Sequence, residues 1–293
     1  MILRRSHMGR LIRMFLVNGS TDGLKTLEIS NMTIKATVFP RPLLKDFLER
    51  DEAGRPGVYM LYGSRIDENS KPMLYIGEGD PVSERLKNHA IKKDFWTEAF
   101  VFTSKDEYLT KTQVKFLESR LINFAKEAKR VELDNVQSSS EPTISEVDRA
   151  EVQQFLDAIQ LLVHSLRLTF FERLTIISPN PTPVKDEIIY EYRVKDAIGK
   201  MAVRDGKYVL LSGSTAVKDY RDSASPNIRK YREELIADGA LKYNDDTKLY
   251  EVVKDIPSNS STYAGIIVCG GNTPGPKVWK HNGQTLREVE SAN

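Results

Sequence analysis

Short apolar runs separated by polar turns dominate residues 9–135, and this pattern is typical of strands joined by tight connections. The turn at 18–23, rich in Gly and Asn, separates the first two runs. Apolar residues at helical spacing, with Pro81 suited to a first helical turn, predict helices that alternate with the strands. The expected strands are 11–17, 27–39, 57–62, 73–76 and 95–102, and the expected helices are 43–49, 81–91 and 111–130.

Two breaks divide the chain. Residues 138–142 read Ser-Ser-Ser-Glu-Pro, and residues 178–183 contain three prolines. Helical periodicity over 148–166 predicts a helix that bridges the two halves. We therefore expect four segments: a β-rich N-terminal extension at 9–50, a first domain at 51–137, a linker with a bridging helix at 138–184 and an accessory domain at 185–293.

The last segment mixes both kinds of periodicity, which predicts an α+β fold. Asp205-Gly206 and Asn244-Asp245-Asp246 are hairpin signals. The expected strands are 197–203, 208–211, 240–243 and 248–253, and the expected helices are 227–237 and 261–269.

Composition narrows the class of protein. An apolar fraction of 40% with 29% charged residues is typical of a soluble globular protein. No apolar run approaches the ~18 residues of a membrane span, and the basic start lacks the features of a signal peptide. We expect a cytoplasmic protein. Cys269 is the only cysteine, which excludes an intramolecular disulfide and a cysteine-rich zinc site, and a net charge of +2 neither favours nor excludes nucleic acid.

Glu118 stands out on the helix expected at 111–130. Its helical neighbours Val114, Leu121 and Ile122 are apolar, so its carboxylate lies beside the apolar stripe. An unpaired carboxylate there is costly. Either a hard cation such as Mg²⁺ or Mn²⁺, or a salt bridge to a nearby Lys or Arg, would compensate it.

A second group of polar residues lies on the helix expected at 81–91. Arg85 and His89 are four residues apart and share a face. Arg85 can hold a phosphate, and His89 can bind a phosphate oxygen or relay a proton. Lys87, Lys92 and Lys93 add positive charge that could contact nucleic acid. An ordinary solvated basic helix is the alternative.

Two tyrosines, Tyr59 and Tyr75, alternate with apolar residues in their strands. Each could be a core tyrosine with a wet hydroxyl, or could present its hydroxyl to an attacking water. A phenol is a poor base unless nearby positive charge lowers its pKa. Gly57 and Gly77 would allow a backbone or phosphate to approach closely.

The order of these residues resembles the GIY-YIG nuclease family over about 55–135. The motifs are Gly57-Val58-Tyr59 and Tyr75-Ile76-Gly77, followed by Arg85, His89, Glu118 and, more loosely, Asn135. Val58 replaces the isoleucine of the family's name, and residues 65–70 lengthen the loop between the motifs. The resemblance implies that Tyr59 positions or deprotonates the water, Tyr75 supports it, Arg85 stabilises the transition state and Glu118 carries the metal.

The resemblance also implies a small three-stranded sheet flanked by helices. The implied activity is DNA phosphodiester hydrolysis with one Mg²⁺ or Mn²⁺ per site, in genome defence, restriction or repair. A bacterial subgroup of the family carries a similar N-terminal extension and a C-terminal domain of unknown function. The C-terminal residues that match it are Gly271-Asn272, Trp279-Lys280 and Gly283-Gln284-Thr285-Leu286. This domain would select the substrate or a protein partner.

Further nucleic-acid contacts are open. Asn135 could contact the substrate or cap a turn, and Trp279 could stack on a base or anchor a core. The helix 227–237 carries Arg229, Lys230 and Arg232 before a hairpin, an order similar to winged DNA-binding modules.

Two other functions stay open beside the DNA nuclease. A non-cleaving adaptor that binds DNA or protein on the same fold would explain the near-neutral charge, and the substrate could be RNA. Because one active site cuts one strand at a time, a homodimer is a further expectation.

Overall fold

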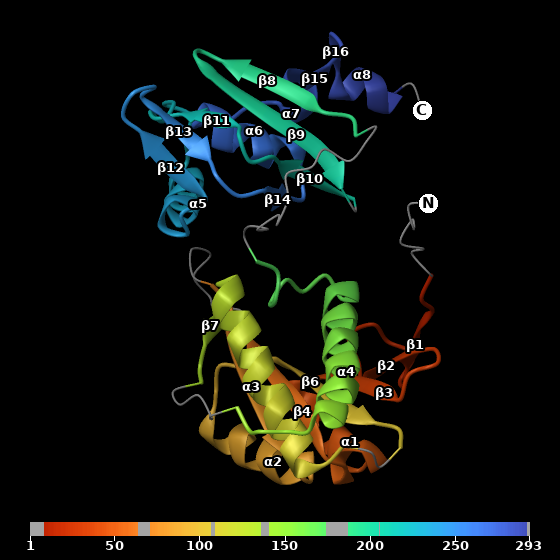
Figure 1. Ribbon diagram of the computed structural model, residues 1–293. Coiled ribbons are helices and arrows are strands. Elements are labelled where there is room, and N and C mark those ends of the chain that lie inside the picture. Colours follow the sequence, from red (N-terminus) through yellow and green to blue (C-terminus); the bar gives the residue numbers. More distant parts are fainter. Residues whose placement is uncertain are drawn as a thin grey trace. The chain divides into compact units, whose positions relative to one another are not determined.

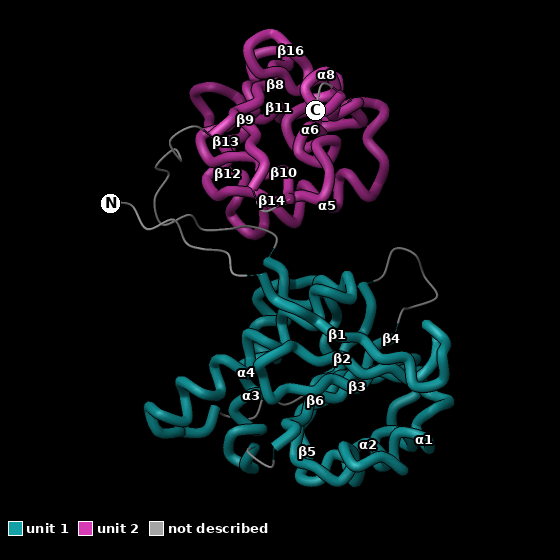
Figure 2. Tube along the Cα trace, turned by 90° about the vertical axis from the view of Figure 1, so that its right-hand side faces the viewer, with its two compact units in different colours: residues 1–173 teal, residues 174–293 magenta. Residues whose placement is uncertain are grey.

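The computed structural model describes residues 9–63, 71–106, 109–135, 141–173, 187–204 and 206–291. The chain forms two compact units, Met1–Arg173 and Leu174–Asn293, coloured separately in Figure 2. The expected loop insertion at 65–70, the serines 138–140, the proline-rich break at 178–183 and Asp205 lie outside the described residues.

Unit 1 is built on a seven-stranded sheet with the order β1-β2-β3-β6-β4-β5-β7. All neighbours are antiparallel except β5 and β7. The strands are β1 (Ile12–Leu16), β2 (Lys25–Ile29), β3 (Ile34–Pro40), β4 (Gly57–Gly63), β5 (Met73–Gly79), β6 (Glu98–Ser104) and β7 (Glu132–Leu133).

Two expectations about this sheet were wrong. The three central strands β4, β5 and β6 do not form a sheet of their own, because β3 pairs with β6 over the whole of Ile34–Pro40 and brings β1 and β2 with it. The single strand expected at 27–39 is two strands, β2 and β3. Asn31 sits between them with φ of 65°, a left-handed conformation that asparagine tolerates better than most residues.

Helices cover both faces of this sheet (Figure 1). Alternation in β4 sends Val58 and Met60 to one apolar cluster and Tyr59 and Leu61 to another. The first cluster is completed by α3 and α4, and the second by α1 and α2. The helices are α1 (Leu44–Leu48), α2 (Val82–Lys92), α3 (Lys111–Ala128) and α4 (Glu146–Ser165), with short 3-10 turns η1 (Arg41–Leu43) and η2 (Asp51–Gly54).

The helix expected to bridge the two halves does not do so. α4 packs its buried Phe155, Ile159 and Leu162 into the same cluster as α3 and the sheet, within unit 1. Its apolar stripe needs one large partner surface, and the sheet supplies it.

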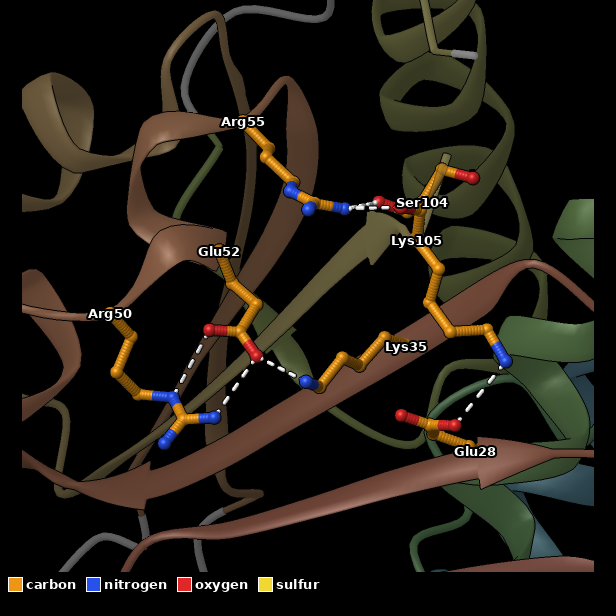
Figure 3. Close-up of polar contacts among 7 residues, drawn as sticks. All are labelled: Glu28, Lys35, Arg50, Glu52, Arg55, Ser104 and Lys105. Carbon is orange, nitrogen blue, oxygen red and sulfur yellow. Dashed lines mark hydrogen bonds and ion pairs between the residues drawn. The ribbon is translucent and has the colours of Figure 1, made fainter. Parts of the chain in front are cut away.

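Ion pairs join η2 to β3, and join β2 to the residue that follows β6 (Figure 3). Glu52 is 5% exposed, and its carboxylate lies 2.5 Å from Lys35 Nζ on β3 and 3.0 Å from an Arg50 nitrogen. Burial raises the pKa of Glu52, but the hydrogen bonds from Arg50 and Lys35 outweigh it and lower this pKa to about 2. Glu28 on β2 pairs with Lys105 at 3.2 Å, beyond the end of β6.

Unit 2 is also α+β, so the predicted fold class is confirmed. Its larger sheet has the order β14-β10-β9-β8-β15-β16, and its smaller sheet has the order β11-β13-β12. The strands are β8 (Tyr190–Val194), β9 (Ala197–Arg204), β10 (Lys207–Leu210), β11 (Thr215–Val217), β12 (Leu241–Asn244), β13 (Leu249–Val252), β14 (Ile256–Ser258), β15 (Lys280–His281) and β16 (Gln284–Thr285).

Helix α6 (Ser261–Cys269) is almost entirely buried in this unit, with Cys269 among its buried residues. The other helices are α5 (Pro226–Ala237), α7 (Gly275–Val278) and α8 (Leu286–Ser291). Among the described residues of both units, no helix has the length and apolar character that a membrane crossing requires.

Candidate active site

The candidate site lies at the β5 side of the unit 1 sheet. Tyr59 on β4 stands opposite Gly77 on β5 in the antiparallel register. A Cβ at Gly77 would lie 2.5 Å from the Tyr59 hydroxyl oxygen and 2.9 Å from the Tyr75 ring. The missing side chain therefore lets the Tyr59 ring lie across β5 toward Tyr75, which gives a physical reason for a glycine at this position.

Helix α2 brings His89 onto the two tyrosines. The Tyr59 hydroxyl and His89 Nδ1 are hydrogen-bonded at 3.0 Å. The Tyr75 and His89 rings meet edge to face with centroids 4.6 Å apart, and the Tyr59 and Tyr75 rings are 6.2 Å apart. Three residues from three elements thus form one connected polar cluster.

Arg85 and Glu118 complete the set with opposite charges. Arg85 is exposed, one turn before His89 on α2, and Glu118 is half-buried on α3. The charge of Glu118 raises the pKa of both tyrosines and the charge of Arg85 lowers it, so both lie within electrostatic reach of the phenols. The structure brings together all five residues that the sequence singled out as catalytic.

Burial keeps the cluster neutral. It is the largest cause that raises the pKa of Tyr59 and of Tyr75 above the ordinary value. Burial likewise lowers the pKa of His89 from 6.5 to about 4, and nearby cations, first Lys93 and then Arg85, add to this effect. At neutral pH the imidazole is therefore uncharged, and neither tyrosine is a phenolate.

The segment after α3 braces the site. β7 pairs in parallel with Met73 and Leu74 of β5, and the Asn135 side chain continues this edge. Its amide donates to the Ile76 carbonyl at 2.7 Å and accepts from the Ile76 N–H at 3.1 Å. Asn135 therefore holds the backbone between Tyr75 and Gly77, and its expected role as a nucleic-acid contact is not supported.

Lys93 has a similar bracing role, which the sequence did not reveal. Its ammonium pairs with Asp134 and lies 4.1 Å from the centroid of the Tyr75 ring. Lys93 is thus engaged by the protein itself, whereas Lys87 and Lys92 are exposed and able to meet a phosphate backbone. Nothing in the basic run around Lys93 distinguished it, because Asp134 is distant in sequence.

The expected nucleic-acid contacts in unit 2 were partly wrong. Trp279 is 0% exposed and donates to the Ser261 carbonyl at 2.8 Å, so it is a core anchor and cannot stack on a base. Arg232 on α5 is 1% exposed and cannot reach a phosphate. A groove of about 850 Å³ does lie beside Trp279, with Arg193, Lys277, Lys280 and His281 in its lining.

The site offers few protein ligands, so a metal ion bound there would be held mainly by waters and by the substrate. The described residues contain no group of three His, Cys, Asp or Glu side chains placed to hold a metal ion. Mg²⁺ is commonly held by one or two carboxylates with waters and substrate phosphate oxygens completing the shell. Glu118, half-buried and within electrostatic reach of Tyr59 and Tyr75, fits that mode.

Comparison with known proteins gives one match. A family model described as a domain of unknown function (DUF4357) matches residues 190–290, which is most of unit 2 and about a third of the chain. No curated protein and no solved structure matches the chain.

Proposed function

We propose that unit 1 is a metal-dependent endonuclease of the GIY-YIG type that hydrolyses DNA phosphodiester bonds. The observation that carries this proposal is the cluster in which His89 is hydrogen-bonded to Tyr59 and in edge-to-face contact with Tyr75, with Arg85 and Glu118 within electrostatic reach of both phenols. A neutral base, a guanidinium and a carboxylate are groups that can serve the hydrolysis of a phosphodiester.

The neutral imidazole is the proton acceptor in this proposal. Tyr59 is 1% exposed, so the attacking water meets the cluster at the half-buried Tyr75 and His89. The water oxygen bonds to phosphorus while its proton passes to His89, and the leaving oxygen departs with the electrons of the broken P–O bond. Tyr59 is the hydrogen-bond partner that holds His89 in place rather than the base itself.

In this proposal Arg85 stabilises the transition state and Glu118 binds the metal ion. The Arg85 guanidinium is exposed where a phosphate can approach, and it stabilises the negative charge that grows on the phosphate oxygens. Glu118 would hold one Mg²⁺ or Mn²⁺, which supplies Lewis-acid stabilisation of the phosphate and the leaving oxygen when bound. Lys87 and Lys92 extend the positive surface on the same helix.

The test is a cleavage assay with Mn²⁺ on plasmid, linear duplex and single-stranded DNA, with matched RNA strands in parallel. We expect the wild type to cut DNA, and Glu118→Gln to cut at least about 100-fold more slowly, because it removes the carboxylate proposed to hold the metal ion. Glu127→Gln is the matched control, since Glu127 is an exposed carboxylate on the same helix that pairs with Arg173.

Each other outcome has a definite meaning. Equal rates for wild type and Glu118→Gln would exclude the metal role of Glu118. Tight binding without cleavage on every substrate would favour the adaptor, and cleavage of RNA alone would favour the RNA nuclease.

A further inference from the structure

Strand β1 forms one margin of the unit 1 sheet (Figure 1). Within the described parts of the chain its hydrogen-bonded neighbour is β2 alone. The Ser30 N–H donates to the Leu11 carbonyl at 2.9 Å, and the Val17 N–H donates to the Leu24 carbonyl at 3.0 Å. Because these bonds alternate along an antiparallel strand, the odd-numbered residues of β1 face β2. The N–H and C=O groups of Ile12 and Met14 and the N–H of Leu16 therefore point away from the sheet, while the Leu16 carbonyl accepts from the Gly19 N–H at 3.2 Å.

This margin is also unusually apolar. Phe15 is 65% exposed, Leu11 56% and Met14 51%. Arg13 is the only charged residue of the strand, and the strand has no proline or bulge to discourage pairing. The edge has no bulge, and within the described residues the outward N–H and C=O groups of Ile12 and Met14 have no partner. An edge of this kind with three large exposed apolar side chains is typical of a strand that acquires a neighbour.

We propose that this neighbour is β1 of a second copy of the chain, joined antiparallel about a two-fold axis through Met14. Strand addition of this kind forms backbone hydrogen bonds from Ile12, Met14 and Leu16 of each copy. The two seven-stranded sheets then become one continuous sheet. This inference does not depend on the nuclease proposal.

Charge selects the register. An axis through Arg13 would set Arg13 directly opposite the partner's Arg13, and like charges that face each other destabilise a strand pair. An axis through Met14 sets Arg13 opposite the partner's Phe15 and Ile12 opposite the partner's Leu16. The guanidinium then lies against an aromatic ring, and the remaining pairs are apolar, so this register avoids the like-charge pair and gives Arg13 an aromatic partner.

The first experiment is sedimentation velocity over about 1 to 200 µM protein. We expect a wild-type dimer, and we expect Met14→Lys to raise its dissociation constant at least about tenfold, because two ammonium groups would meet at the axis. The matched control is Val203→Lys, since Val203 is 50% exposed on an interior strand of unit 2, close to the 51% of Met14. A urea titration of each variant checks that the fold is kept.

Several results would overturn the proposal. A wild type that stays monomeric throughout the range excludes the dimer. Dimerisation of Met14→Lys at the wild-type constant excludes this edge, and equal weakening by Val203→Lys removes its specificity.

The second experiment reads the register directly. Met14→Cys with a short bismaleimide should yield a covalent dimer, because the two introduced thiols lie opposite each other at the axis. The wild type is the control, since its single cysteine, Cys269, is 1% exposed. Cross-linking of Met14→Cys at no more than the wild-type level would refute the Met14-centred register.

Discussion

The two units bury an ionised side chain in different ways. In unit 1, Glu52 is 5% exposed and accepts from Arg50 and Lys35, which lower its pKa to about 2. In unit 2, Arg232 is 1% exposed, and its Nε and Nη1 have no hydrogen-bond partner among the residues that the structure describes. Burial lowers the pKa of Arg232, although the rings of Tyr220 and Tyr250 lie 5.0 Å and 5.7 Å from its guanidinium carbon.

The comparison indicates that a buried charge with partners, such as Glu52, stabilises the fold, whereas a partly unsatisfied one, such as Arg232, is only tolerated. A buried ion whose partners satisfy it is costly to remove, whereas a partly satisfied one often costs stability. Unit 1 applies the same principle at its candidate site, where the buried Tyr59 hydroxyl has His89 as its hydrogen-bond partner. The expected consequences of three substitutions follow, from the largest to the smallest.

Loss of the hydrogen bond between Tyr59 and His89 should have the largest effect, and this effect is on the cleavage rate. Tyr59→Phe keeps the ring that packs over Gly77 but removes the hydroxyl bonded to His89, so cleavage should fall about 100-fold while the free energy of unfolding changes little. A cleavage assay and a urea titration measure the two quantities. Tyr62→Phe, on the same strand, is the control, and it should leave the rate unchanged. An unchanged rate for Tyr59→Phe would refute the proposed role of Tyr59.

Loss of the paired carboxylate of Glu52 should have the next largest effect, on the free energy of unfolding. Glu52→Gln should lower the free energy of unfolding by about 2 kcal/mol at pH 7, because it leaves Lys35 and Arg50 without their carboxylate. The folded pKa of Glu52 is about 2 against 4.5 unfolded, so its stabilisation is complete above pH 4.5 and is lost as the pH falls toward 2.

Urea titrations between pH 7 and pH 2 measure both effects. The difference between wild type and Glu52→Gln should shrink below pH 4.5, where the wild-type carboxylate becomes protonated on unfolding. A difference that stays constant down to pH 2 would show that packing, rather than charge, makes Glu52 important.

Replacement of the buried Arg232 should have the smallest effect, again on the free energy of unfolding. Arg232→Met preserves much of the buried volume and removes the two unsatisfied donors, so the free energy of unfolding of unit 2 should stay within about 1 kcal/mol of wild type or rise. The lost bond from Nη2 to the Val217 carbonyl opposes this gain. Thermal denaturation followed by near-UV circular dichroism measures it. A decrease in the free energy of unfolding as large as that expected for Glu52→Gln would show that the two units do not differ in this respect.

Local pattern in the sequence determined most of the helices and strands, whereas the five residues of the candidate site were singled out by the resemblance of their order to a nuclease family. The alternation of Val58 and Met60 with Tyr59 and Leu61 is visible in the sequence because a strand has a period of two. The helical spacing of Arg85 and His89, and of Glu118 with its apolar neighbours, is equally local. Such features need no knowledge of distant partners.

Tertiary structure alone decided which distant residues meet. The pairing of β3 with β6, the packing of α4 on unit 1, and the partners of Lys93 and Asn135 all join residues far apart in the chain. The burial of Trp279 and the lowered pKa of His89 depend on the same packing. Periodicity reports which face of an element is apolar, but the surface that covers this face, and the desolvation that shifts a pKa, exist only after the chain has folded.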